Sequence, residues 1–135
     1  MRELTIPALL ENLPEVTAFV DGLLAELECP LNTQYEIDVA VDELFTNISS
    51  YAYAPETGSA TIQIEVFEDP RSVAITFIDS GVPYDPLAKP DPDITLSAEE
   101  RQIGGLGIYM VKQSMDEVTY DYKDGQNILK IRKCI

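Results

Sequence analysis

Residues 33–50 predict one long amphipathic helix, and the packing that this helix needs is the strongest constraint on the fold. An apolar stripe follows three- and four-residue spacing along it, through Ile37, Val41, Leu44 and Ile48. A neighbouring face carries Glu43 and Asn47, which place a carboxylate and a carboxamide one helical turn apart. The stripe has to be buried against a second layer of secondary structure, whereas the polar pair can take part in chemistry.

Two further helices are expected, one on each side of this segment. The first begins at Asn12, a suitable N-cap, with Pro14 in its first turn and Glu15 at the capping-box position, and ends near Cys29. Its apolar residues recur at helical spacing, at Val16, Phe19, Val20, Leu23 and Leu24. The other is opened by residues 104–107, and the same spacing continues at Ile108, Val111 and Met115. Together these helices can form one layer of the protein.

Five short segments predict the strands of the other layer. They alternate apolar and polar residues or form short apolar runs, at residues 3–6, 61–68, 73–78, 118–122 and 128–131. Turns are expected at residues 68–71 and at Asp124–Gly125. The predicted fold is therefore an α+β, two-layer α/β sandwich, with a mixed, mostly antiparallel sheet and helices on one face. Residues 1–135 are expected to form a single domain.

The segment from Ser80 to Ile103 is too long to be a passive connection in a compact domain. It contains four prolines and shows little periodicity. Such segments are usually lids, binding loops or disordered chain. Residues 97–100 are expected to begin one short helix inside it.

The charge of the chain excludes several classes of partner and chemistry. Its 24 acidic and 9 basic residues give a net charge of −15, which argues against direct binding of nucleic acid or of an anionic membrane. The sequence contains no histidine, so Ser-His-Asp and Cys-His hydrolases and histidine metal sites are excluded within it. Because a nucleotide is also anionic, it would have to arrive with a cation or be held by backbone N–H groups.

The cysteines and the N-terminal residues indicate a cytoplasmic protein. Cys29 and Cys134 lie far apart in the sequence, and two reduced thiols are expected rather than a disulfide. No basic-then-apolar signal segment is present, and no apolar run approaches the length of a membrane span.

Two of the three motifs that carry chemistry lie on the long helix and at the end of a strand. The Glu43 carboxylate can accept a proton, and the Asn47 amide oxygen is a hard ligand suited to Mg²⁺; a solvated polar pair is the alternative. Asp79 follows a strand and precedes Gly81. It can accept a hydrogen bond from an exocyclic amine while Gly81 lets the backbone approach a flat ring; an ordinary turn is the alternative.

The third motif consists of Gly104, Gly105, Leu106 and Gly107 at the start of a helix. Glycines at this place leave backbone N–H groups free, and the helix dipole adds positive potential, so the motif suits phosphate groups. A helix cap with a hinge would have the same sequence. Arg101 precedes the glycines and can reach a terminal phosphate or pair with a neighbouring acid.

In this order, the three motifs resemble the GHKL ATPase superfamily, and within it the branch of stand-alone anti-sigma-factor serine/threonine kinases. The matching segments are residues 42–47, 79–86 and 104–111, and the likeness covers nearly the whole chain. The resemblance implies binding of ATP with Mg²⁺ and phosphorylation of an anti-sigma-factor antagonist. It implies a sigma factor as a second partner, and a homodimer as the expected assembly.

The resemblance also implies a role for each residue of the site. Glu43 looks like the general base that deprotonates the attacking hydroxyl, and Asn47 looks like the Mg²⁺ ligand. Asp79 looks like the residue that reads adenine, with Gly81 as its close-approach partner. The implied phosphate cradle comprises Gly104, Gly105, Leu106 and Gly107, and residues 83–103 look like the ATP lid.

Three positions depart from the pattern of this branch. Tyr51 stands where many relatives carry histidine, and Asn127 stands where a threonine is frequent, although Asn127 can still hydrogen-bond near the base. Ile103 occupies the place of the lid arginine of kinase-active relatives, so Arg101 is the nearest substitute. Because phosphoryl transfer depends on positioned positive charge, two rivals remain: a non-catalytic module that sequesters a sigma factor or other regulator, and a slow ATPase.

Overall fold

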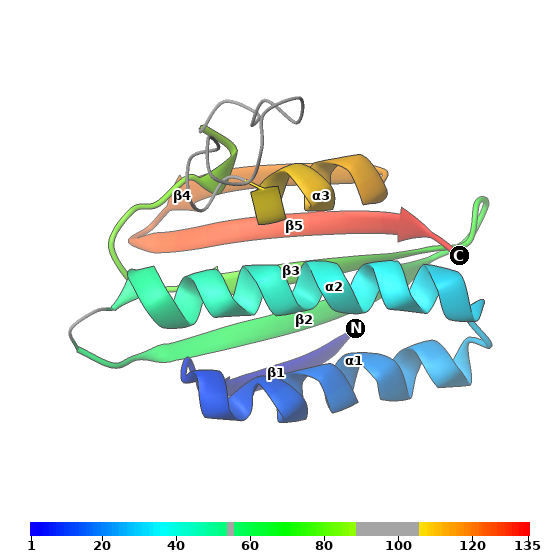
Figure 1. The fold of residues 1–135 in the computed structure, drawn as a ribbon, viewed down its shortest axis with the longest axis horizontal. Coiled ribbons are helices and arrows are strands. Elements are labelled where there is room, and N and C mark those ends of the chain that lie inside the picture. Colours follow the sequence, from blue (N-terminus) through cyan, green and yellow to red (C-terminus); the bar gives the residue numbers. More distant parts are fainter. Residues whose placement is uncertain (54–55, 89–105) are drawn as a thin grey trace.

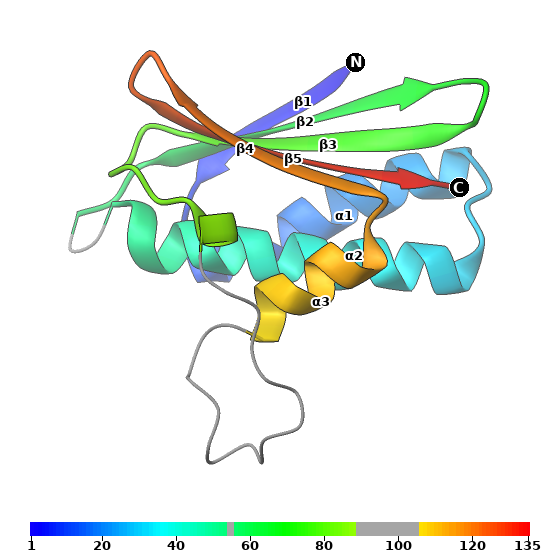
Figure 2. The same ribbon diagram turned by 90° about the horizontal axis from the view of Figure 1, so that it is seen from above.

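The alternation of the predicted strands produces one sheet, and the amphipathic helices cover one of its faces (Figures 1 and 2). The computed structural model describes residues 1–53, 56–88 and 106–135. Its main elements are β1 (Arg2–Pro7), α1 (Leu13–Glu26), α2 (Leu31–Asn47), β2 (Ser59–Phe67), β3 (Ser72–Asp79), α3 (Leu106–Ser114), β4 (Glu117–Lys123) and β5 (Gln126–Cys134). Three short helical turns accompany them, at Leu10–Asn12, Ile48–Ala52 and Pro86–Ala88.

The strands lie in the order β1-β2-β3-β5-β4, and each neighbouring pair in the described chain is antiparallel. The predicted two-layer fold is confirmed, and its sheet is more uniform than the mixed sheet that the sequence suggested. In the central pair, Asp79 of β3 lies opposite Asn127 of β5, and Phe77 lies opposite Leu129. The end of β3 and the start of β5 therefore meet at one end of the sheet.

The core lies between the helices and the sheet, as Figure 2 shows from the side. The apolar stripe of α2 is buried there through Ile37, Val41 and Leu44, each at most 1% exposed. Alternate residues of the central strands meet it, at Ile62, Ile64, Ile75, Phe77 and Ile131. This packing fixes the position of the polar face of α2 relative to the ends of β3 and β5.

Two helix boundaries differ from those that the sequence predicts. Asn12 occupies the N-cap position of α1, but its side chain donates to the Pro7 carbonyl (2.9 Å) and not to the first turn of the helix. The reason is that residues 10–12 already form a helical turn, so Asn12 has helical backbone angles. Helix α2 ends at Asn47 and continues as a π-helical turn, Ile48–Ala52, where the sequence predicted regular helix to Ser50.

The predicted short helix at residues 97–100 lies outside the described residues. None of the helices in the described chain is long and apolar enough to span a lipid bilayer.

Candidate functional site

A pocket of about 380 Å³, partly open to solvent, lies between the end of α2 and the ends of β3 and β5. Its apolar lining comes from Leu44, Ile48, Phe77, Pro86 and Leu129. The polar lining consists of Asn47, Asp79, Tyr84, Tyr120 and Asn127. An apolar hollow with a few convergent polar groups is typical of a site for a small, flat ligand.

Asp79 is the buried acid of this pocket, with 6% of its surface exposed. Its Oδ1 atom accepts hydrogen bonds from the Gly81 N–H and from the Asn127 amide, both at 2.9 Å. Among the described residues, both hydrogen bonds to this carboxylate end on Oδ1. The second oxygen, Oδ2, therefore remains as an acceptor for a ligand N–H group.

Asn127 holds Asp79 in place and is itself held from the other side. Its amide nitrogen donates to Asp79 and to the Val82 carbonyl (both 2.9 Å). Its oxygen accepts from the Tyr84 N–H (3.1 Å) and from the Tyr120 hydroxyl. Because two donors meet the oxygen, the amide can point its nitrogen only towards Asp79. We call this group, Tyr120, Asn127 and Asp79, the amide clamp.

Tyr120 has no signal in the sequence that marks it as a site residue. It alternates with Val118 and Tyr122 in a strand pattern, which indicates only that it lies on one face of the sheet. Its place in the pocket follows from the register of β4 on β5, where Tyr120 lies opposite Leu129. Tyr51 packs on the Tyr84 ring at a centroid distance of 5.5 Å.

Glu43 and Asn47 lie one turn apart on α2, as their spacing predicts. The Asn47 amide nitrogen donates to Glu43 Oε1 at 3.4 Å. Burial raises the pKa of Glu43, the bond from Asn47 opposes this rise, and the neighbouring charge of Asp42 adds to it. A raised pKa makes the carboxylate a stronger base.

The donor set at Asn47 fits a hard cation such as Mg²⁺. Its nitrogen faces Glu43, so the neutral amide oxygen is the atom available as a ligand. The described residues contain no group of three or more acidic, cysteine or histidine side chains that could hold a metal ion. An ion at Asn47 would therefore complete its coordination with phosphate oxygens and water.

Gly107, in the first turn of α3, lies directly against Glu43. A methyl group at this position would overlap the Glu43 carboxylate, so the end of this flexible side chain or the start of α3 would have to shift. Gly81 likewise lies close to the backbone of Ala52. A methyl group there would overlap the Ala52 carbonyl, which accepts a hydrogen bond from the Val82 N–H at 2.9 Å. The role of Gly81 beside a flat ring stays a prediction.

A shared pocket and two contacts thus bring the described site residues together. Asp79, Asn127 and Asn47 line one pocket, Asn47 bonds to Glu43, and Glu43 meets Gly107. The remaining predicted residues, Arg101, Gly104 and Gly105, lie outside the described chain, as does the side chain of Leu106.

Comparisons with known proteins show which family the chain belongs to. The family described as histidine kinase-like ATPase domain matches residues 6–133. The serine/threonine-protein kinase BtrW of Bordetella bronchiseptica is 29% identical over 98 residues, which cover 73% of this chain and 68% of that protein. The serine-protein kinase RsbW of Bacillus mycoides is 26% identical over 131 residues, which cover 94% of this chain and 81% of that protein.

A solved structure has the same fold. A chain of the SiaB–SiaC complex from Pseudomonas aeruginosa superposes with a TM-score of 0.58, covering 98% of this chain and 89% of that chain. The sequence identity is 17%, so this likeness concerns the fold alone.

Proposed function

Because this chain belongs to the histidine kinase-like ATPase domain family, we propose that it binds Mg²⁺–ATP and phosphorylates a serine or threonine of a protein partner. We further propose that the partner is an anti-sigma-factor antagonist, that a sigma factor is the second partner, and that the protein acts in the cytoplasm as an anti-sigma regulator. The relatives named serine-protein kinases support the transfer. The observation that carries the proposal is that Asp79 and Asn47 line one pocket and that Asn47 bonds to Glu43.

The pocket supports recognition of adenine. Its apolar walls can hold the two faces of a purine, while Asp79 Oδ2 accepts a hydrogen bond from the 6-amino group. The 6-oxo group of guanine would place an acceptor against this carboxylate, so guanine would leave two acceptors unpaired. The amide clamp keeps Asp79 oriented for this discrimination.

The far end of the site supports binding of the phosphates. The first N–H groups of α3 and the positive end of its dipole favour anionic oxygens near Gly107. Asn47 would hold Mg²⁺ through its amide oxygen, and the bound ion would supply positive charge beside the phosphates.

Glu43 is placed to act as the general base. The acceptor hydroxyl oxygen forms a bond to the γ-phosphorus while the bond from that phosphorus to the β–γ bridging oxygen breaks. ADP leaves with the bond electrons, and the hydroxyl proton passes to Glu43. The raised pKa of Glu43 favours this transfer.

The test uses radiolabelled ATP and a purified candidate antagonist, with wild type and Glu43→Gln in parallel. Wild type is expected to label the partner, and Glu43→Gln is expected to bind Mg²⁺–ATP while its labelling rate falls by about 100-fold or more, within the range of general-base catalysis. A wild type as inert as Glu43→Gln towards every tested antagonist would remove the kinase from the proposal.

One observation favours a second candidate, a non-catalytic module that sequesters a regulator. Ile103 stands where kinase-active relatives carry a lid arginine. Tight binding of Mg²⁺–ATP without production of ADP would select this candidate, and release of phosphate without a protein acceptor would select a slow ATPase. The homodimer stays a prediction, which sedimentation of the purified chain can test.

A further inference from the structure

Four large apolar side chains gather on the surface formed by α2 and α3, which lie side by side in both views (Figures 1 and 2). They are highly exposed: Leu31 by 84%, Tyr35 by 70%, Val39 by 41% and Met110 by 51%. Scattered apolar residues are normal on a protein surface, but a contiguous group marks an interaction site more often than chance.

A groove of about 340 Å³ runs between the two helices at this place. Its lining comes from Tyr35, Glu36, Val39 and Ala40 of α2 and from Met110, Val111 and Ser114 of α3. Ala40 and Val111 are buried and form the floor, while Tyr35 and Met110 stand at the rim. We call this feature the α2–α3 groove. Two packed helices leave a furrow that accepts the side chains of a third helix.

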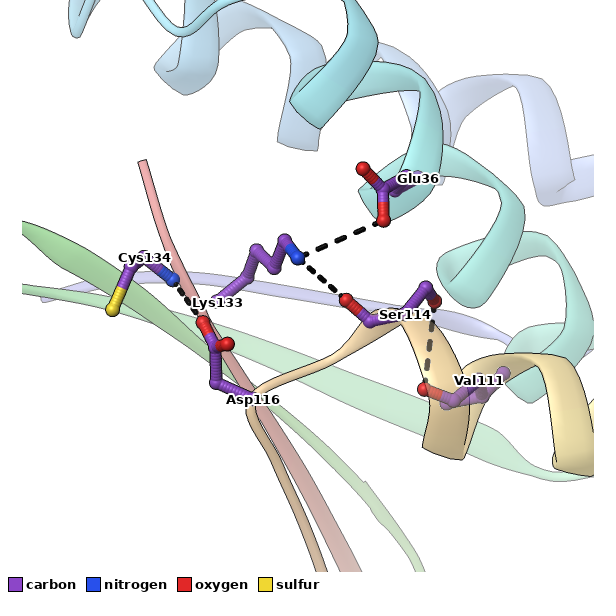
Figure 3. A network of polar contacts seen from close by, with 6 residues as sticks. All are labelled: Glu36, Val111, Ser114, Asp116, Lys133 and Cys134. Carbon is purple, nitrogen blue, oxygen red and sulfur yellow. Dashed lines mark hydrogen bonds and ion pairs between the residues drawn. The ribbon is translucent and has the colours of Figure 1, made fainter.

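One end of the α2–α3 groove is fixed from beneath by the last strand, as Figure 3 shows. The Lys133 ammonium donates to the Ser114 carbonyl at the end of α3 (2.6 Å) and pairs with the Glu36 carboxylate of α2 (3.6 Å). The same side chain thus ties the two helices together. The groove is therefore formed before any partner binds.

The other end of the groove leads to Glu43. Tyr35, Val39 and Glu43 follow one another at four-residue spacing and form one ridge of α2. Across the groove, Met110 lies one turn after Gly107, the residue that touches the Glu43 carboxylate. Glu43 therefore stands between the α2–α3 groove on one side and the nucleotide pocket on the other.

We propose that the α2–α3 groove docks the phosphoacceptor protein through an amphipathic helix that lies beside the accepting hydroxyl. This inference rests on the proposed kinase function, because it places the acceptor on the side of Glu43 opposite the nucleotide. The groove has the apolar character for such a helix, and its open end directs the neighbouring hydroxyl to the base.

Charge decides which kind of helix fits. The acid of α2 that lines the groove is Glu36, which pairs with Lys133, and Asp42 and Glu43 follow on the same helix, which has no lysine or arginine. Asp38 is not part of the lining, because it interacts with Asp21 of α1, and α3 contributes one lysine, Lys112. The docked helix should therefore carry lysine or arginine beside its apolar face. A second copy of α2 is a poor occupant of this groove, because that helix carries acids and no lysine or arginine.

The spacing along α2 limits the size of the docked helix. From Leu31 to Val39 the ridge is about 12 Å long, which corresponds to roughly two helical turns, at 1.5 Å per residue. Glu43 lies about 6 Å beyond Val39 on the same scale. The acceptor hydroxyl should therefore follow the last apolar anchor of the partner by roughly one turn.

The test measures binding of a labelled helical peptide to the full chain by fluorescence anisotropy. The peptide has leucines on one face, lysines at the flanks and a serine one turn from the last leucine; a control peptide has glutamate in place of lysine. The groove variant combines Tyr35→Ser and Met110→Ser. Leu10→Ser is the matched control, because Leu10 is 59% exposed and lies outside the groove.

Wild type and Leu10→Ser are expected to bind the lysine peptide at least tenfold more tightly than the groove variant does. Both proteins are expected to bind the glutamate peptide more weakly than the lysine peptide. The groove variant should bind Mg²⁺–ATP like wild type. Failure of wild type to bind the lysine peptide, or equal binding by the groove variant, would overturn the docking proposal. Self-association of wild type that the groove variant abolishes would identify a second copy as the occupant and would also overturn it.

The same experiment separates this inference from the kinase. If the protein binds the peptide through the groove but does not bind ATP, the proposed kinase function is overturned and the docking surface is supported. Phosphorylation of the serine at equal KM in wild type and the groove variant would support the kinase and overturn the docking proposal. A raised KM with unchanged kcat in the groove variant supports both.

Discussion

The pocket beside Asp79 and the α2–α3 groove each lie within about one helical turn of Glu43, but they differ in the polar groups that they contain. In the pocket, Asp79 and Asn127 are each 6% exposed and are joined by hydrogen bonds. In the groove, Tyr35 and Met110 are more than half exposed, and apolar atoms dominate the lining. The pocket is specified by oriented polar groups, whereas the groove is specified mainly by its apolar shape.

This difference corresponds to the two ligands that a protein kinase must join. A nucleobase offers few polar atoms, so each donor and acceptor of the pocket has to be oriented before binding. A protein partner offers a large surface, so a few apolar anchors can hold it with little polar detail. Changes of one atom should therefore have large effects in the pocket and at Glu43, and small effects elsewhere.

The largest effect is expected at Gly107, where the two regions meet. The methyl group of Gly107→Ala would overlap the Glu43 carboxylate and displace it or the first turn of α3. A base moved by about 1 Å can cost roughly 100-fold in rate, so phosphoryl transfer should fall by about that factor. The affinity for ATP should fall by a smaller factor, because the amide clamp is untouched and only the proposed phosphate site at the first turn of α3 is disturbed. Single-turnover transfer and calorimetry measure the two quantities.

Gly22→Ala is the matched control for this variant. A methyl group at Gly22, in α1, meets nothing within 4 Å. Transfer by Gly22→Ala should equal that of wild type. An unchanged rate in Gly107→Ala would mean that Glu43 does not act from the position in which it touches α3.

The second-largest effect is an expected loss of ATP affinity in Asp79→Asn, in the pocket. The amide removes the charge and sets a donor against the amino group of adenine, while Asn127 loses its carboxylate partner. An unpaired buried polar group costs about 1–3 kcal/mol, so the affinity for ATP should fall by roughly 5- to 160-fold in calorimetry. Asp121→Asn removes the same charge from an exposed position of β4 and should bind like wild type. Equal losses in both variants would indicate a general effect of charge.

The fold was largely predictable from the sequence because its periodicities are strong. The stripe of α2 and the alternation of β2 and β5 each identify a face, and the Asp124–Gly125 turn sets the last hairpin. The capping of α1 was not predictable, because the turn before Asn12 carries no distinct signal. The π-helical turn after Asn47 is likewise a local departure that propensities do not reveal.

The pairing of site residues was predictable from the sequence only where both residues belong to one helix or strand. Glu43 and Asn47 share a helix, so their spacing was sufficient to pair them. The amide clamp needs the registers of two strand pairs, Asp79 on Asn127 and Tyr120 on Leu129, which no local pattern contains. The contact of Gly107 with Glu43 needs the packing of α3 on α2. The roles assigned to these residues stay predictions until the variants are measured.

A smaller loss of ATP affinity is expected when the amide clamp loses its hydrogen bond from Tyr120. Tyr120→Phe removes the hydroxyl that donates to Asn127 and so lets the amide turn. One lost hydrogen bond of about 1 kcal/mol corresponds to roughly fivefold, which is the expected loss of affinity for ATP. Discrimination against GTP should weaken by a similar factor, because Asn127 would no longer hold Asp79 in one orientation. Tyr122→Phe is the control, since Tyr122 is 43% exposed on the same strand.

The smallest effect on ligand binding is expected at the interface of α1 and α2, outside both hollows. Burial raises the pKa of Asp38 to about 7, and the hydrogen bond and charge of Asp21 add to the rise. The folded protein therefore holds a proton on Asp38 that the unfolded chain, with a pKa near 4, releases more readily. Stability from this group is present below about pH 4 and is lost as the pH rises to about 7.

Asp38→Asn should remove this dependence without changing the binding of ATP. The variant's free energy of unfolding, relative to wild type, should rise from pH 4 to about pH 7 and then level off, because both states of wild type are ionised above that value. Urea unfolding at several pH values measures this difference. Asp42→Asn, at an exposed position of the same helix, should show no such rise. A flat difference for Asp38→Asn would mean that the buried carboxyl is already ionised in the folded protein at low pH.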